Sequence, residues 1–386
     1  MSGKWVPFHA PSIGEEEIAA VSQVLRSGWL TSGSKVKEFE SLFAEQVGAK
    51  HAVATNSGTA ALHIALEALG VKEGDEVIVP TMTFAATAEV VHYLRATPVL
   101  VDCEPVTLNL DLNALDRAMT RRTKVIMPVH FGGHPCEMDR IQRLAESHHA
   151  TVVEDAAHAF PACYRDRQVG HISEVTCFSF YATKPLTTGE GGMATTDNAE
   201  RAEHMRCMTL HGITKDAWNR YTAAGSWFYE IQFPGYKYNM TDIAAAIGLV
   251  QLQRSGQFLQ SRTQIAAMYN EAFADLAELQ CPIAEPHVGH AWHLYIIQLQ
   301  LNRLRISRNQ FIEALKKEHV GASVHFIPLH LHPYYRKTFG YRPEDFPQAT
   351  ALFDRIVSLP IYPSMDEEDV AAVIRAVRTV VAQWRR

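Results

Sequence analysis

The sequence predicts an α/β fold: a mixed, mostly parallel sheet with helices on both faces, followed by a smaller α+β domain. Short apolar, β-branched runs alternate with segments of helical spacing from residue 51 onward. Repeated strand, helix, strand units form parallel sheets that helices cover on both sides. Beyond residue 284 this rhythm changes, and a length of 386 residues allows two or three domains.

The elements of the first half follow from these patterns. Strands are expected at residues 51–55, 76–80, 98–101, 124–129 and 151–155. Apolar residues recur with helical spacing between them, which predicts helices at residues 57–69, 84–94 and 137–148. A Gly/Thr-rich loop without a helix separates two further strands, which we therefore expect to pair antiparallel, at residues 176–181 and 191–196. Sheets of this kind bind ligands beyond the carboxyl ends of their strands.

The second half begins with an irregular segment. Residues 211–238 are rich in aromatic side chains and have little periodicity, which is typical of a functional or interface loop. A helical pattern runs from residue 241 to about 277. The later pattern predicts a strand, a helix, a strand and two helices, at residues 293–301, 308–319, 322–326, 348–357 and 366–384. We predict a large domain at residues 1–255 and a small domain at residues 256–386.

Charge and composition narrow the classes of partner. With 42 acidic and 36 basic residues the formal net charge is -6, which predicts no binding to nucleic acid or to anionic membranes. The six cysteines form no C-x-x-C pair, and no apolar run is long enough for a signal sequence or a membrane span. A cytoplasmic protein with free thiols and a small-molecule partner is expected.

Several common catalytic motifs are absent from the chain. It has no G-x-G-x-x-G after the first strand, no G-x-x-x-x-G-K-[ST], no H-E-x-x-H and no G-x-S-x-G. These absences disfavour dinucleotide-binding, P-loop, zinc-protease and α/β-hydrolase functions. The chemistry is therefore expected from polar residues at the strand ends.

Two strand ends carry such residues. Ser57, Gly58 and Thr59 lie between a predicted strand and a helix, where free backbone amides can bind a phosphate. An ordinary helix cap is the alternative there. Asp155 ends an apolar strand and His158 follows closely, which predicts a carboxylate and an imidazole at one sheet edge. A capping aspartate is the alternative to a catalytic one.

Lys184 is the most informative single residue. No acidic residue lies within the five positions before it, and a glycine-rich run follows. Apolar surroundings disfavour the ammonium form, and a neutral amine is what Schiff-base chemistry needs. A lysine in a surface loop is the alternative. A phosphate site, a strand-end carboxylate and a desolvated lysine are together what pyridoxal 5'-phosphate (PLP) requires.

Four blocks of sequence make a family resemblance specific. They are SGTAAL at 57–62, EDAAH at 154–158, FSFYATKPLTTGEGG at 178–192 and GYKYNMTD at 235–242. They resemble the signature blocks of the DegT/DnrJ/StrS family of sugar aminotransferases, which are PLP-dependent enzymes of fold type I. The resemblance extends from residue 28 to residue 360. The segment HAWHLY at 290–295 is similar to relatives that make UDP-4-amino-4-deoxy-arabinose.

The resemblance implies a role for each residue of the cofactor site. Lys184 matches the lysine that forms the Schiff base with PLP, Asp155 the partner of the pyridinium nitrogen, and His158 the residue beside the ring hydroxyl. These are the three candidate catalytic residues. Phe84 matches the aromatic residue that stacks on the ring. Matches to phosphate contacts are Gly58, Thr59, Ser179 and Asn239. In the family this asparagine reaches the phosphate of the opposite subunit, which implies a homodimer with shared active sites.

The resemblance also implies a reaction. The amino group would come from glutamate, leaving 2-oxoglutarate, and would pass to a nucleotide-linked keto sugar with its keto group at C4. The product would be an amino sugar for polysaccharide, lipopolysaccharide or secondary-metabolite biosynthesis. Candidate substrate contacts are Trp29, Thr31, Lys237 and His325. A histidine packed in the core is the alternative for His325.

Other functions on the same scaffold stay open at this point. A cyclitol aminotransferase and a non-catalytic regulatory protein are the two alternatives. A sugar dehydratase is disfavoured because such family members have a histidine where this chain has Lys184. His287, His290 and His293 are spaced by three residues, but no cysteine completes a ligand set and residues three apart in a strand point to opposite faces. No metal site is therefore expected.

Overall fold

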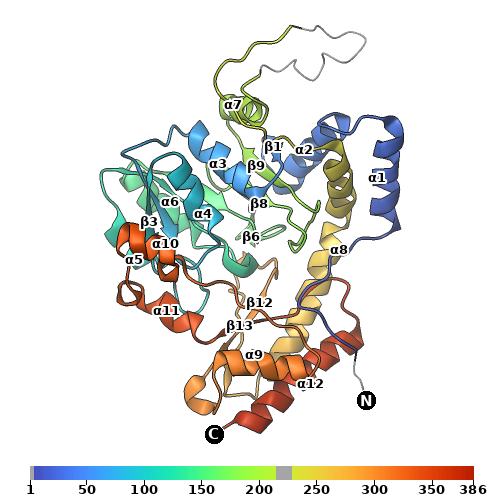
Figure 1. The fold of residues 1–386 in the computed structure, drawn as a ribbon, viewed down its shortest axis with the longest axis vertical. Helices are drawn as coiled ribbons and strands as arrows, with labels where there is room; N and C mark the ends of the chain where they lie inside the picture. Colours follow the sequence, from blue (N-terminus) through green and yellow to red (C-terminus); the bar gives the residue numbers. More distant parts are fainter. Residues whose placement is uncertain (1–3, 214–227) are drawn as a thin grey trace.

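The computed structural model describes residues 4–213 and 228–386, and its centre is a seven-stranded sheet of order β1-β9-β8-β5-β4-β2-β3 (Figure 1). The strands are β1 (His51–Thr55), β2 (Glu76–Pro80), β3 (Thr97–Val101), β4 (Thr123–Ile126), β5 (Thr151–Asp155), β8 (Val175–Ser179) and β9 (Gly192–Thr196). β9 runs antiparallel to β1 and β8, and all other neighbours pair in parallel. The predicted mixed sheet and its antiparallel pair are confirmed.

Helices cover both faces of this sheet because alternate strand residues are apolar on both sides. Val77 and Val79 belong to a core shared with α3 (Gly58–Ala68), α4 (Ala86–Tyr93) and α7 (Ala199–Thr209). Ile78, between them, belongs to the core on the opposite face. The helices of that face are α2 (Ser34–Val47), α5 (Leu112–Ala118) and α6 (Met138–Ser147). This is the two-sided packing of an α/β sheet.

A smaller antiparallel sheet lies at the end of the molecule that carries both termini (Figure 1). It consists of β10 (Leu279–Gln280), β12 (Tyr295–Leu299) and β13 (Ile356–Leu359). Its helices are α9 (Arg308–Lys317) and α12 (Glu367–Trp384). Helix α8 (Asp242–Phe273) is continuous through residue 255 and connects this end to the central sheet. The predicted boundary at 255 therefore falls inside a helix, and the division into two domains stays a prediction.

Some elements differ from the sequence pattern. Residues 322–326 were expected to form a strand, but only Ser323 pairs, as an isolated bridge to Ser358, so that prediction is wrong. The helix expected at 348–357 ends at Phe353, as α11 (Pro347–Phe353), and the β-branched residues after it pair with β12 to form β13. Pairing inside a buried sheet overrides the helical pattern there.

The remaining elements complete the fold. The sequence pattern did not predict α1 (Glu15–Ser27), which packs with α2 against α8. A third sheet joins β11 (Val288–Gly289), β6 (Cys163–Tyr164) and β7 (Arg167–Gln168). Helix α10 (Pro333–Phe339) and α11 pack back onto the core of the central sheet. Half of the irregular segment expected at 211–238, residues 214–227, lies outside the described residues.

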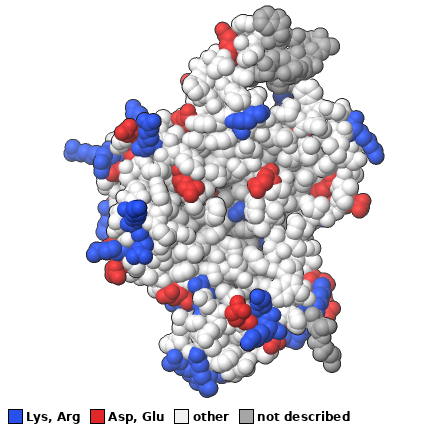
Figure 2. Space-filling model, in the orientation of Figure 1, with Lys and Arg blue, Asp and Glu red and all other residues white. Residues whose placement is uncertain are grey.

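The described surface carries charges of both signs. Lysine and arginine side chains are interspersed with aspartate and glutamate over the face drawn in Figure 2. Over residues 4–213 and 228–386, no helix combines the length and the apolar character that crossing a membrane would need.

Candidate active site

The amino terminus of α3 forms a cup at the carboxyl edge of the sheet. Ser57 caps the helix, because its Oγ accepts the backbone N–H of Ala60 at 3.1 Å. A Cβ on Gly58 would lie 2.8 Å from the Cβ of Ser179, and one on Gly192 would lie 2.4 Å from the carbonyl oxygen of Ser57. Only glycines allow these three strand ends to approach so closely. The structure thus brings Gly58, Thr59 and Ser179 together around free amides suited to a phosphate.

Asn239 lies beside this cup in its own chain. It forms an isolated bridge with Thr55 at the end of β1. Its Nδ2 donates to the Oγ of Ser32 at 2.8 Å, and its Oδ1 accepts the ammonium of Lys237 at 2.6 Å. The link to Ser32 connects Asn239 with the loop before α2, where Trp29 Nε1 donates to the carbonyl of Ser32 at 3.1 Å.

Two of the four candidate substrate residues therefore lie near Asn239. Lys237 contacts it directly, and Trp29 reaches it through Ser32. Thr31 is exposed in the same loop and accepts the backbone N–H of Asp242 on its carbonyl at 3.2 Å. No substrate contact is tested by this geometry, so these roles stay predictions.

Asp155 is held at the end of β5 by two donors. It is 5% exposed; its Oδ2 accepts the hydroxyl of Thr87 at 2.8 Å and its Oδ1 accepts the backbone N–H of Ala157 at 3.1 Å. The Oγ1 of Thr83 lies 2.7 Å from that of Thr87, and because Thr87 gives its proton to Asp155, Thr83 is the donor. Burial raises the pKa of Asp155, although Thr87, Ala157 and Lys184 each act to lower it.

Lys184 lies in the turn after β8 with its amine close enough to Asp155 for mutual attraction. The side chain is half-buried, and over the described parts of the chain its Nζ makes no hydrogen bond or ion pair. Burial lowers the pKa of Lys184 to about 8, and the attraction of Asp155 partly opposes this. Roughly a tenth of such amines are neutral at pH 7. The predicted desolvated lysine therefore lies beside the predicted carboxylate.

His158 and His325 lie close to Lys184. The Nδ1 of His158, which is 3% exposed, accepts the backbone N–H of Gly132 at 3.2 Å, so the neutral ring carries its proton on Nε2. Burial lowers the pKa of His158, and Lys184 and His325 lower it further. Burial and the positive charge of Lys184 lower the pKa of His325 to about 4. Both rings are therefore neutral at physiological pH.

Phe84 lies at the exposed rim of the site. It is 62% exposed, and its ring centre is 5.7 Å from that of Phe326. Phe326 in turn lies 5.8 Å from the ring of His158. An aromatic residue in this position is available to cover a planar ring; the stacking role of Phe84 stays a prediction.

Sequence reasoning missed three members of the site. Thr83 and Thr87 hold Asp155, and Gly132 fixes the proton of His158. Thr87 could have been found, because it lies three residues after Phe84 in the first turn of a predicted helix that starts at a sheet edge. Gly132 carries no such signal, since only its backbone takes part.

The residues fit PLP: a glycine-walled anion cup, a buried carboxylate and a desolvated lysine meet at one edge of an α/β sheet. Fold and site together define a PLP-dependent aminotransferase of fold type I. The chain belongs to the DegT/DnrJ/EryC1/StrS aminotransferase family, whose profile matches residues 11–378. The predicted family, enzyme class and cofactor are confirmed.

Individual relatives match over nearly the whole chain. The uncharacterised protein MJ1066 of Methanocaldococcus jannaschii is 51% identical over 99% of both chains. The spore coat polysaccharide biosynthesis protein SpsC of Bacillus subtilis is 50% identical over 98% of this chain and 97% of its own. Among solved structures, the putative sugar aminotransferase Spr1654 of Streptococcus pneumoniae in its PMP form superimposes with a TM-score of 0.92 at 37% identity, over 98% of this chain and 99% of that one.

Proposed function

We propose that this enzyme transfers an amino group from glutamate to a nucleotide-linked keto sugar, with the keto group at C4, to supply an amino sugar for polysaccharide biosynthesis. The observation that carries the proposal is the desolvated amine of Lys184 beside the buried carboxylate of Asp155. The sugar acceptor is supported by relatives: SpsC is named for polysaccharide biosynthesis and Spr1654 as a putative sugar aminotransferase.

Each residue has a proposed task in the reaction. PLP, when bound, supplies an electron sink for the carbon that loses a proton. Asp155, as a carboxylate, would hold the protonated ring nitrogen, and His158 would donate its Nε2 proton beside the ring oxygen. Lys184 would remove and return the proton at the substrate carbon. A pKa near 8 suits this task, because both forms of the amine are accessible at neutral pH.

The phosphate and the substrate would bind on either side of this centre. Gly58, Thr59 and Ser179 would hold the phosphate through amides and hydroxyls. Lys237, which is exposed, would meet the diphosphate of the nucleotide, and Trp29, Thr31 and His325 would line the sugar. The net charge of the chain is negative, so any attraction for an anionic substrate must come from local groups such as Lys237.

The test is turnover with defined substrates. The PLP-loaded enzyme, given glutamate and a UDP-linked 4-keto sugar, should release 2-oxoglutarate and an amino sugar, and a keto-cyclitol should not react. Lys184→Ala should reduce kcat by roughly 10²–10⁴-fold and abolish the absorption band of the Schiff base between the cofactor and the protein, whereas Lys50→Ala, a matched change at an exposed lysine, should change neither. Turnover of the cyclitol alone, or full activity of Lys184→Ala, contradicts the proposal.

The proposed homodimer with shared sites is tested by mixing variants. If Asn239 serves the opposite subunit, combining inactive Lys184→Ala and Asn239→Ala chains should restore about a quarter of the wild-type sites. In the structure Asn239 bridges Thr55 of its own chain, close to its own cup. A mixture without recovered activity would therefore assign Asn239 to the site of its own subunit.

A further inference from the structure

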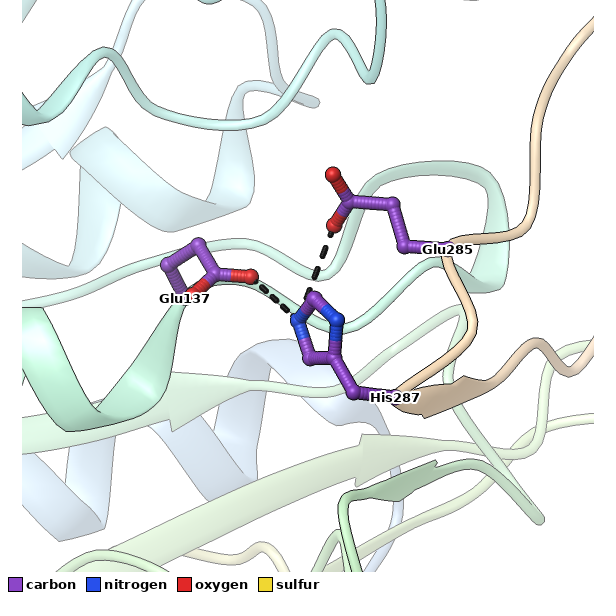
Figure 3. A group of neighbouring side chains, drawn as sticks. All are labelled: Glu137, Glu285 and His287. Atoms are coloured by element: carbon purple, nitrogen blue, oxygen red, sulfur yellow. Dashed lines mark hydrogen bonds and ion pairs between the residues drawn. The ribbon is translucent and has the colours of Figure 1, made fainter.

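Three metal-ligating side chains meet at a place outside the active site. Figure 3 shows the carboxylates of Glu137 and Glu285 directed at the ring of His287. The Nε2 of His287 lies 2.5 Å from Oε1 of Glu137 and 3.7 Å from Oε2 of Glu285. One ligand atom from each lies within 4.8 Å of the other two, and no other trio of His, Cys, Asp or Glu does so among residues 4–213 and 228–386.

The three side chains come from two segments far apart in sequence. Glu137 is the residue before α6, and Glu285 and His287 belong to the stretch that leads into β11. All three are half-buried, and Oε2 of Glu137 also accepts the hydroxyl of Tyr164 at 3.3 Å. The hydrogen bond from Tyr164 holds Oε2 of Glu137, so that Oε1 faces His287. Carboxylates that bind metals are commonly oriented by a hydrogen bond of this kind to their second oxygen.

His134, which borders the cavity beside these side chains, supplies an independent sign that a hydrogen-bond donor is missing there. It is 3% exposed, and its Nδ1 lies 2.8 Å from the carbonyl oxygen of Pro135, which can only accept, so Nδ1 carries the proton. Its Nε2, the atom with the lone pair, is buried without a hydrogen-bond partner. Burial lowers the pKa of His134 despite the attraction of Glu285, so the ring stays neutral. A buried lone pair without a donor is uncommon in native proteins.

His134, Glu137 and Glu285 line one cavity, which lies beside His287. A space of about 210 Å³ is bordered by His134, Glu137 and Glu285, together with Arg140 and the loop at residues 104–113. Such a space holds an ion and its water ligands with room to spare. Three ligands, one nitrogen and two oxygens, therefore lie close enough together for one ion, and the cavity beside them leaves room for its water ligands.

We propose that Glu137, Glu285 and His287 bind a divalent transition-metal ion of the zinc class, and that His134 accepts a hydrogen bond from a water ligand of that ion. Imidazole together with carboxylate suits zinc and its neighbours in the first transition row, whereas magnesium and calcium prefer oxygen alone. Two ligand atoms on a tetrahedral zinc lie roughly 3.3 Å apart, given bonds of about 2.0–2.2 Å. The separations of 2.5 and 3.7 Å at His287 are within a small side-chain adjustment of that value.

This assignment differs from the expectation drawn from the histidine spacing. Of the three histidines considered there, only His287 belongs to the cluster; His290 stacks on Trp292 with ring centres 4.0 Å apart, and His293 lies 4.4 Å from His158. The other two ligands, Glu137 and Glu285, come from positions that no spacing pattern connects.

The ion would stabilise a segment that supports the active site. His134 directly follows Gly132 and Gly133, whose carbonyls accept the backbone N–H groups of Leu294 and Ala291. The N–H of Gly132 donates to His158. A bound ion would therefore link the stretch before β11 to the turn that orients His158. We expect zinc to raise the stability of the protein more than it changes kcat.

The experiment is metal titration of the PLP-loaded enzyme after dialysis against a chelator. Calorimetry with zinc chloride should give one ion bound per chain with micromolar or tighter affinity, and the unfolding midpoint should rise by about 3 °C or more at saturating zinc. Magnesium chloride should produce neither effect. Affinity for zinc should fall at acid pH, because protons compete for the imidazole of His287.

Variants assign the binding to these residues. Glu285→Gln, His287→Asn and His134→Asn should each weaken zinc binding by roughly 10–100-fold, and His148→Asn, the same change at an exposed histidine, should leave it unchanged. No stoichiometric binding by the wild-type enzyme overturns the proposal, as does binding that Glu285→Gln and His287→Asn leave intact. Neither result bears on the aminotransferase reaction, whose residues are separate.

Discussion

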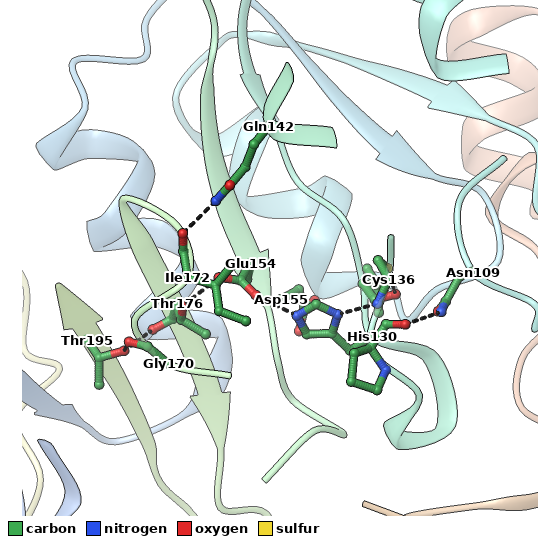
Figure 4. Close-up of polar contacts among 12 residues, drawn as sticks. Asn109, His130, Cys136, Gln142, Glu154, Asp155, Gly170, Ile172, Thr176 and Thr195 are labelled. Carbon is green, nitrogen blue, oxygen red and sulfur yellow. Dashed lines mark hydrogen bonds and ion pairs between the residues drawn. The ribbon is translucent and has the colours of Figure 1, made fainter. Parts of the chain in front are cut away.

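Glu154 and Asp155 are adjacent buried carboxylates on β5, yet they lie on opposite faces of the sheet and in different surroundings. Glu154 is 0% exposed, and both of its oxygens are used: Oε1 accepts the hydroxyl of Thr176 at 3.0 Å and Oε2 accepts Nε2 of His130 at 2.8 Å. The backbone N–H of Cys136 donates to Nδ1 of His130 at 3.0 Å, so the His130 proton is on Nε2 (Figure 4).

Asp155 is also buried, but it faces an ionisable partner, Lys184. Thr87 and Ala157 hold its oxygens, and Lys184 attracts it without a direct bond. The contrast teaches that burial alone does not identify a functional carboxylate. A buried acid whose oxygens are both filled by donors of the core serves the fold, whereas one that faces a desolvated amine is available for chemistry.

The largest expected effect separates the two residues by activity. Asp155→Asn keeps the shape and an acceptor for Thr87 but loses the charge that would hold the protonated cofactor ring, so kcat should fall by roughly 10²–10⁴-fold. Steady-state kinetics with glutamate measures this. Glu154→Gln is the matched control and should retain kcat within about threefold, because Glu154 lies on the other face. Comparable losses in the two variants would contradict the contrast.

A second prediction concerns stability, for which Glu154 should matter more than Asp155. Glu154→Ala leaves the Nε2 proton of His130 and the hydroxyl of Thr176 buried without acceptors, which should cost about 1–3 kcal/mol of unfolding free energy for each donor. Asp155→Asn should destabilise the protein less, by about 1–3 kcal/mol at most, since the amide oxygen still accepts from one of its two donors and only the other loses its acceptor. Denaturant unfolding of the cofactor-free proteins measures both. A more destabilised Asp155→Asn would show that Asp155 is the structural member of the pair.

The sequence could predict this edge of the sheet but not the difference between the two acids. Strand alternation, a strand-end aspartate and a lysine without acidic neighbours locate Asp155 and Lys184, because these signals are local. The partners that distinguish Glu154 from Asp155 come from four separate segments, through His130, Thr176, Thr87 and the backbone of Ala157. Such contacts depend on the order of the strands in the sheet. The same is true of β13, which forms because it pairs with β12, although the sequence pattern predicted a helix there. No pattern within one segment specifies them.

The smallest expected effect is on the titration of Lys184. Burial lowers its pKa to about 8, and the negative charge of Asp155 opposes that shift. Removing the charge in Asp155→Asn should therefore lower the pKa further, by about 1 unit, which increases the neutral fraction of the amine at pH 7. The pH dependence of Lys184 acylation in the cofactor-free enzyme, followed by mass spectrometry, reports this value. Glu154→Gln should leave it unchanged, because the attraction on Lys184 comes from Asp155. An equal shift in both variants would mean that the sheet does not separate the charges of Glu154 and Asp155 electrostatically. The structural acid and the functional acid would then differ in the hydrogen bonds to their oxygens, and not in their position relative to Lys184.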